Sequence, residues 1–418
     1  MSRGLMVVQG AVLGLPNGSM GVLPNQYLAT AIEAGMIESD GSGIPLESIQ
    51  PASLDLRLGA MAYRVRCSFL PTNQTVQRRM SGVVIDELSL SGRGAVLAPG
   101  LPYLIPLKER LDLPANIRAR ANPKSSTGRA DVFTRVITDY SYRFDEIKAG
   151  YKGGLYLEVV PLSFPVLVRE DLSLNQLRLS VGHTELSDQE INKFHQSQPI
   201  LFERGADVPP EKLDLSGGLF LGLDLKGDRT GDVGYRARSS PPLLDMTSVR
   251  TADPKDYWEP VKREEGNRIV LTPKVFYLLM SYEAVTIPPA LAAEMTAYDP
   301  TSGELRTHYA GFFDPGFGYD EGDTFKGSTA ALEVRAHDVP FMIEHRQPVC
   351  KLTFERMLEA PTQLYGKEIG SNYQRQTETL GKHFRLPNRI ATSTSGGRGR
   401  NGPQMVGDDQ LNLLDPNV

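Results

Sequence analysis

The chain has 418 residues, of which 40% are hydrophobic and 8% aromatic, enough apolar material for the cores of two domains. Its 45 basic and 50 acidic residues give a formal net charge of -5, which excludes a generally basic, nucleic-acid-binding surface and makes any anion site local. Only two cysteines occur and no run of about 18 apolar residues, which argues against a disulfide framework, cysteine-rich zinc sites and membrane spans.

Regular elements are expected in a definite order along the chain. Residues 24–36 predict a helix, because Leu28, Ile32 and Met36 recur every four residues on one face. A second helix is expected to begin near Ser187. Apolar or alternating runs, punctuated by many of the 40 glycines and 30 prolines, predict strands at 54–59, 102–107, 155–162, 275–280 and 341–346.

An internal repeat organises these strands. Residues 156–179 align without gaps with residues 331–354, so that Leu-Glu-Val recurs and Pro165 matches Pro340. Generic strand-proline texture is the alternative explanation, but several of the matched positions are not merely apolar. The chain therefore reads as two copies of one β-unit.

The repeat sets the expected domain boundaries. We expect an N-terminal tail, a first β-unit, a linker or insertion, a second β-unit and a flexible, glycine-rich C-terminal tail. The corresponding residues are 1–21, 22–183, 184–255, 256–383 and 384–418.

The polar turn "KSSTGR", residues 124–129, follows an Asn-Pro break and combines small hydroxyl side chains with two cations. Hydroxyls, backbone amides and a guanidinium on one turn suit phosphate oxygens, which accept several charge-assisted hydrogen bonds. A solvated polar turn is the plainer alternative from these residues alone.

Several motifs together resemble the dCTP deaminase family, which shares the β-fold of the trimeric dUTPases. They occur in the family's order: "IQPASLDLRLG" (49–59), "KSSTGR" (124–129), "YRFD" (142–145), "YKGGLYLEV" (151–159), "DPGFG" (314–318) and "YGKEIGSNYQRQ" (365–376). The resemblance implies a mainly β protein, with two dUTPase-like distorted β-barrel (β-clip) units in tandem and a few short helices.

It also implies deamination of dCTP to dUTP and ammonia without zinc. His183-Thr184-Glu185 matches half of the zinc-deaminase signature, but no C-x-x-C follows, so a carboxylate is needed to activate water. Mg²⁺ is expected only as the companion of the triphosphate, with no metal ligand from protein side chains.

The resemblance assigns roles residue by residue. Glu158 would be the general base, Ser125 and Arg129 would polarise the water and the developing tetrahedral centre, and Lys124 and Ser126 would hold phosphates. The remaining nucleotide-binding candidates are Arg143, Asp145, Asp314, Tyr365 and Gln376. In the tail, Asn372 replaces the lysine that is usual in the family, which makes Lys367 and Arg375 possible substitutes.

The duplication leaves two candidates for the base. Glu333 is the second copy's counterpart of Glu158, and the family's sites form between units, so the loop of copy one could meet the hairpin of copy two. Glu158 is favoured because only the first copy retains both the serine-arginine loop and the glutamate.

Two other functions stay open, namely a dUTPase or bifunctional enzyme that forms dUMP and pyrophosphate, and a non-catalytic nucleotide-binding protein. We expect dCTP and dUTP as ligands, no nucleic-acid or membrane partner, a cytoplasmic location, and a homo-oligomer that is trimeric or pseudo-trimeric.

Overall fold

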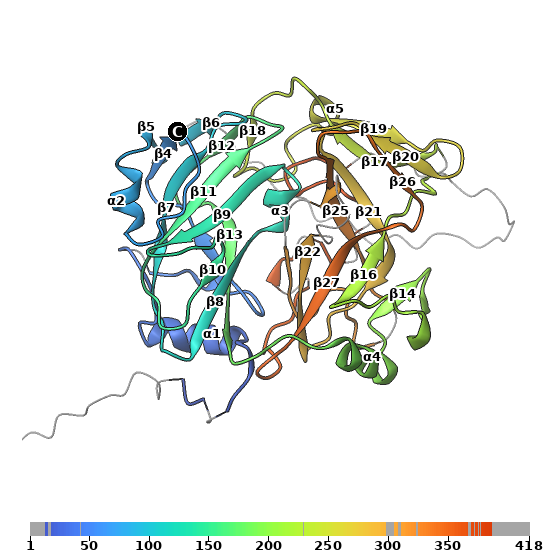
Figure 1. The fold of residues 1–418 in the computed structure, drawn as a ribbon, viewed down its shortest axis with the longest axis horizontal. Helices are drawn as coiled ribbons and strands as arrows, with labels where there is room; N and C mark the ends of the chain where they lie inside the picture. The colour runs from blue at the N-terminus through green and yellow to red at the C-terminus, as the bar shows by residue number, and fades with distance from the viewer. Residues whose placement is uncertain are drawn as a thin grey trace, which may run out of the picture. The chain divides into compact units, whose positions relative to one another are not determined.

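Paired strands dominate the fold (Figure 1), which confirms the mainly β prediction. The computed structural model describes residues 13–15, 18–41, 43–228, 230–297, 305–307, 311–322, 325–366, 369–371, 373–374, 376 and 378–386. The predicted tails, 1–21 and 384–418, lie mostly outside these residues.

The first half forms two main antiparallel sheets. One has the order β1-β13-β8-β10 with β3 also on β13, and the other β5-β4-β7-β11-β9 with β2 also on β7. Its strands are β1 Gly21–Val22, β2 Ile37–Ser39, β3 Leu54–Arg57, β4 Met61–Val65, β5 Val84–Ser89, β6 Ala95–Leu97, β7 Tyr103–Asp112, β8 Ile117–Pro123, β9 Val132–Thr138, β10 Glu146–Ile147, β11 Lys152–Pro161, β12 Val166–Val168 and β13 Ser173–Val181.

The second half is built on the same plan. One sheet has the order β15-β14-β21-β17-β19, with β25 joining β21 to β23, and the other has the order β16-β27-β22-β24. Its strands are β14 Leu201–Glu203, β15 Ala206–Asp207, β16 Leu219–Gly222, β17 Asp232–Ala237, β18 Leu244–Asp245, β19 Trp258–Lys262, β20 Arg268–Leu271, β21 Tyr277–Val285, β22 Leu291–Ala297, β23 Leu305–Thr307, β24 Gly311–Phe313, β25 Ser328–Ala336, β26 Phe341–Glu344 and β27 Pro348–Arg356.

The internal repeat is visible in the strand pairing. β11 pairs with β7 as β25 pairs with β21, and β13 pairs with β8 as β27 pairs with β22. In the register, Glu158 lies opposite Leu104 and Glu333 lies opposite Leu278. The two glutamates therefore occupy equivalent places in the two halves.

Both expected helices form. α1 spans Asn25–Glu33, shorter than 24–36, because Gly35 adopts a φ of 70° and turns the chain before the buried Met36. α4 spans Asp188–Ser197, and Ser187 caps it in a reciprocal capping box with Glu190. The other helices are α2 Val76–Met80, α3 Ser125–Gly128, α5 Pro254–Tyr257 and the 3-10 turns η1 Leu46–Ser48 and η2 Pro210–Lys212. In the described part of the chain, no helix combines the length and the apolar character needed to cross a bilayer.

Residues 184–255, expected as a linker or insertion, contribute strands to both halves. β14 and β17 pair with β21, and β16 pairs with β27. β18 instead pairs in parallel with β12 of the first half.

The two halves also share part of their core. The rings of Trp258, Phe276 and Phe384 belong to the same buried cluster as Phe164 of the first half. Edge-to-face contacts with centroids 5.1 Å apart join Phe164 to Trp258. This shared packing holds together the segments that build the site.

Candidate active site

Two adjoining cavities lie where the α3 loop of the first half meets β24 and β25 of the second half. We call them the Glu333 cavity and the Asp55 cavity, each after a residue that lines that cavity and not the other. The residues common to both linings are Lys124, Ser125, Phe312, Asp314, Tyr365 and Tyr373.

The α3 loop, residues 124–129, carries the sequence KSSTGR directly after β8. Lys124 is extended, and the following four residues form one helical turn. Thr127 Oγ1 donates a hydrogen bond of 2.8 Å to the Leu174 carbonyl on β13, which anchors the loop to the sheet. Lys124 and Ser125 are thereby left to line both cavities.

Glu333 approaches this loop from β25, as the position of α3 beside β25 in Figure 1 suggests. A Cβ atom added to Gly128 would lie only 2.8 Å from Glu333 Oε1, so the glycine permits the close approach. Burial raises the pKa of Glu333 to about 8, although the positive charge of Arg129 opposes the rise. The site thus contains a carboxyl group that titrates near neutrality.

Arg129, at the end of the α3 loop, is held by three residues of the C-terminal segment, which begins at Tyr365. Its guanidinium lies 3.8 Å from the ring centroid of Tyr373 and donates hydrogen bonds to Gln376 Oε1 at 2.6 Å and to the Thr379 carbonyl at 3.2 Å. Gln376 Nε2 in turn donates to the Thr329 carbonyl on β25. Gln376 therefore connects the loop of one half to the strand that carries Glu333.

Glu158 has different surroundings. Its carboxylate accepts hydrogen bonds from Arg135 at 2.5 and 3.1 Å, and the Arg135 guanidinium lies 3.7 Å from the Phe144 ring centroid. Glu158 lines neither cavity. The structure brings Ser125 and Arg129 together with Glu333 rather than with the favoured Glu158.

Arg143 and Asp145 also lie away from the two cavities. Arg143 is exposed and pairs with Glu146, while Asp145 accepts a hydrogen bond from the Val136 amide at 2.7 Å. Burial raises the pKa of Asp145 to about 7, against the effect of that hydrogen bond. Neither Arg143 nor Asp145 lines the cavity that contains Glu333.

The Asp55 cavity combines a lysine with two aspartates, Asp55 and Asp314. Lys124 Nζ forms an ion pair with Asp55, and Ser126 lines the same space. Burial raises the pKa of Asp55 above its usual value, although Lys124 opposes the rise. Lys382 interacts electrostatically with both groups: burial and the charge of Lys124 lower its pKa, while the charge of Asp55 opposes this.

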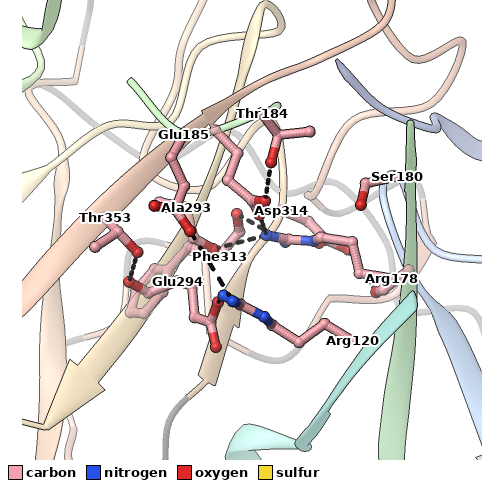
Figure 2. Close-up of polar contacts among 12 residues, drawn as sticks. Arg120, Arg178, Ser180, Thr184, Glu185, Ala293, Glu294, Phe313, Asp314 and Thr353 are labelled. Atoms are coloured by element: carbon pink, nitrogen blue, oxygen red, sulfur yellow. Dashed lines mark hydrogen bonds and ion pairs between the residues drawn. The ribbon is translucent and has the colours of Figure 1, made fainter. Parts of the chain in front are cut away.

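Asp314 lines both cavities and is held from the other half of the chain. Ser53 Oγ donates to one of its carboxylate oxygens at 3.0 Å, and Arg178 Nη2 donates to the other at 2.9 Å. Figure 2 shows Arg178 and Arg120 side by side, directed at Asp314 and Glu294 respectively.

Family models match most of the chain in two adjacent blocks. The N-terminal domain of 2'-deoxycytidine 5'-triphosphate deaminase matches residues 19–183, and its C-terminal domain matches residues 187–384. A crystal structure of 2'-deoxycytidine 5'-triphosphate deaminase from Agrobacterium tumefaciens is 43% identical, with a TM-score of 0.76 over 82% of this chain and 99% of that chain. The chain belongs to the dCTP deaminase family. The resemblance inferred from the sequence motifs is thereby confirmed.

Two curated relatives of this family are shorter. The dCTP deaminase of Natronomonas pharaonis is 26% identical over 187 residues, which is 44% of this chain and 88% of its own length. The dUMP-forming dCTP deaminase of Dictyoglomus turgidum is 26% identical over 199 residues, 46% of this chain and 90% of its own length. Each relative thus aligns over nearly its whole length with less than half of this chain.

Some residues of the site were not singled out in the sequence. Gly128 and Tyr373 lie inside quoted motifs, but nothing local marks them as contacts of Glu333 or Arg129. Asp55 carries a weak signal, because it interrupts an apolar strand. Asn372, Lys367 and Arg375 lie outside the described residues.

In the described residues, no group of three or more His, Cys, Asp or Glu side chains has an arrangement that could hold a metal ion.

Proposed function

We propose that this chain hydrolyses dCTP to dUTP and ammonia, with Glu333 as the general base. One observation carries the proposal: Ser125 and Arg129 of the first half line the same cavity as Glu333 of the second half. Membership of the dCTP deaminase family supports the substrate class. The preference for Glu158 is replaced because its carboxylate is bound by Arg135.

In the proposed reaction, Glu333 accepts a proton from water, and the resulting hydroxide attacks C4 of cytosine. The tetrahedral centre collapses to the C4 carbonyl: the proton held by Glu333 leaves with the amine as ammonia, and the remaining hydroxyl proton passes to ring N3. One water is consumed for each ammonia released. A carboxyl with a pKa of about 8 is matched to both proton transfers near neutral pH.

Ser125 and Arg129 would act on the same centre. Ser125 can hydrogen-bond the attacking water, and Arg129 supplies positive charge where negative charge develops. The contacts of Arg129 with Tyr373 and Gln376 hold its guanidinium in place before the substrate arrives. Tyr365 also lines both cavities, so the C-terminal segment would cover the bound nucleotide.

The triphosphate is assigned to the Asp55 cavity. Lys124 and Ser126 would hold its oxygens, and a phosphate would compete with Asp55 for Lys124. Lys382 would add a second cation, since an anion at this place relieves its repulsion from Lys124. Mg²⁺ would offset the phosphate charge, and we assign it no ligand from Asp55 or Asp314, which are bonded to Lys124, Ser53 and Arg178.

A second product is kept as a candidate because the Dictyoglomus turgidum relative is named dUMP-forming. In that case the dUTP formed in the site would be cleaved further to dUMP and pyrophosphate. The glycine-rich stretch 393–402 lies outside the described residues.

The test is product analysis with dCTP and Mg²⁺, following ammonia, dUTP and dUMP together. Glu333→Gln should lower kcat by at least about 100-fold, because the amide cannot accept the proton. Glu158→Gln should keep turnover and lose only stability, because it removes the ion pair between the buried Glu158 and the partly exposed Arg135.

Loss of turnover in Glu158→Gln with activity retained in Glu333→Gln would reverse the assignment of the base. Formation of dUMP and pyrophosphate by the wild type would establish the second product. A well-folded wild type that releases no ammonia from dCTP would contradict the proposed function.

A further inference from the structure

Arg178 is a fully buried arginine that reaches from one half of the chain to the other. It lies on β13, its side chain is 2% exposed, and the partners found for its guanidinium belong to the second half. Nη1 donates to Glu355 Oε2 at 2.9 Å and to the Ala293 carbonyl at 3.1 Å. A charge buried this deeply needs such partners to offset its desolvation.

The same guanidinium contacts three consecutive residues of the site. Its carbon lies 4.0 Å from the centroid of the Phe312 ring, and Nη2 lies 3.5 Å from the Phe313 carbonyl and 2.9 Å from Asp314 Oδ1. All three residues line the Glu333 cavity (Arg178, Phe313 and Asp314 are drawn in Figure 2). A single side chain therefore touches the ring, the backbone and the carboxylate of one wall.

The Asp314 carboxylate is held by the first half on both of its oxygens. Arg178 occupies Oδ1, and Ser53 Oγ, itself buried, donates to Oδ2 at 3.0 Å. Two bonds from fixed donors leave little freedom for the carboxylate to rotate. Its remaining lone pairs are then presented to the cavity in one orientation.

Glu355 secures the other side of the arginine. Its second oxygen accepts a hydrogen bond from Thr184 Oγ1 at 2.7 Å. Burial would raise the pKa of Glu355, but the charge of Arg178 and this hydrogen bond hold it below its usual value. Nη1 of the arginine is thus held by the ionised Glu355 carboxylate, while Nη2 is directed at Asp314 in the site.

We propose that Arg178 is a positioning residue for nucleotide binding: it sets the Phe312–Asp314 wall of the cavity from the opposite half of the chain. The inference rests on the proposed function, since that wall is taken to face the nucleotide. Arg178 itself does not line either cavity, so it acts through Phe312 and Asp314.

Arg120 is a matched control for a merely structural role. It also crosses between the halves, pairing with Glu294 at 2.7 Å, but it is 42% exposed and its ion-pair partners, Glu294 and Glu185, lie outside the Phe312–Asp314 wall. If Arg178 only joined the halves, Arg178→Met and Arg120→Met would both lower stability and the active fraction, with KM unchanged.

The experiment measures KM and kcat for dCTP, with thermal unfolding in the presence and absence of nucleotide, for wild type, Arg178→Met, Arg178→Lys, Ser53→Ala and Arg120→Met. Arg178→Met should raise KM about tenfold or more, and Arg178→Lys, which keeps the charge but loses the fork of donors, should recover part of this loss. Ser53→Ala should raise KM by a smaller factor, and Arg120→Met should leave KM unchanged.

A wild-type KM in folded Arg178→Met and Ser53→Ala would overturn the proposal. If Arg178→Met does not fold, Arg178→Lys and Ser53→Ala decide, and an unchanged KM in both has the same meaning. If wild type does not turn over dCTP but dCTP or dUTP raises its unfolding temperature, loss of that shift in the Arg178 variants supports the positioning role while the proposed function fails. If neither nucleotide shifts the wild type, both fail.

Discussion

Glu333 and Glu158 show how surroundings, rather than position in a motif, give a residue its chemistry. Both follow a leucine and precede a valine on equivalent strands, opposite Leu278 and Leu104. Arg135 forms an ion pair with the carboxylate of Glu158. Gly128 packs against Glu333 instead, and the Glu333 carboxylate lines the cavity. The same Leu-Glu-Val tripeptide therefore yields a structural ion pair in one half and a candidate base in the other.

The raised pKa of Glu333 predicts the pH dependence of the reaction. A general base must be deprotonated, so kcat/KM for dCTP should rise about tenfold per pH unit below about 8 and level off above it. Initial rates of ammonia release between pH 6 and 9.5 measure this. A profile that is flat through this range would show that another group is the base.

The same group should affect stability in the opposite direction. Its pKa is about 8 in the folded chain and about 4.3 in the unfolded chain, so between these values the folded state holds the extra proton. The free energy of unfolding therefore falls as the pH rises through this window. Glu333→Gln should be more stable than wild type at pH 9, by on the order of a few kcal/mol, with little difference at pH 4. Urea unfolding at the two pH values measures the change.

At the scale of elements, the α3 loop packs closely against β25, and the absence of a side chain at Gly128 allows this close contact with Glu333. β8 delivers the loop, Thr127 ties it to β13, and Gln376 joins Arg129 to β25. Phe384, near the C-terminal end of the described residues, is buried among aromatic rings of both halves. Strand β25 thus carries Glu333, while the α3 loop supplies Ser125 and Arg129.

Gly128→Ala tests this arrangement. The added methyl would stand 2.8 Å from Glu333 Oε1 and must displace the carboxylate, although the backbone of Gly128 is helical and accepts alanine. We expect kcat to fall about tenfold to 100-fold with the fold retained, because a shift of about 1 Å in a reacting group has effects of this size.

Gly82→Ala is the control, since it lies in a turn after α2 where the nearest atom is 3.9 Å away. Equal activity of Gly128→Ala and Gly82→Ala would mean that Glu333 is not poised against the loop.

At the scale of the whole molecule, the halves are joined too closely to act as separate domains. Trp258 and Phe384 pack in the first half's core, and the buried Arg178 binds second-half carboxylates. The described residues of one chain already bring the loop of the first half to the strand of the second half that carries Glu333. An oligomer, if it forms, is not needed to assemble the Glu333 cavity.

We therefore expect residues 1–386 to unfold in one cooperative transition, although chains of this length often unfold in stages. The single tryptophan, Trp258, reports on the shared core because it is buried there. Its fluorescence and far-UV circular dichroism should give the same urea midpoint. Two separated midpoints would show that the halves unfold independently.

Much of the architecture follows from local patterns. Alternation and proline breaks predicted β3, β7, β11, β21 and β26, the Ser187 cap predicted α4, and the Leu-Glu-Val repeat predicted the equivalence of β11 and β25. These features are local because they depend on side-chain periodicity and capping within a few residues. The loop of residues 124–129 was likewise recognisable from its residue types.

The choice between the two glutamates was decided only by tertiary packing. Glu158 and Glu333 share the tripeptide Leu-Glu-Val, and nothing within either strand tells which one Gly128 and Arg129 will approach. The same is true of Arg178, an ordinary strand residue until its partners Asp314 and Glu355, 136 and 177 residues away, are brought to it. Contacts between halves depend on how two finished sheets pack together, and that packing leaves no periodic trace in the sequence of either one.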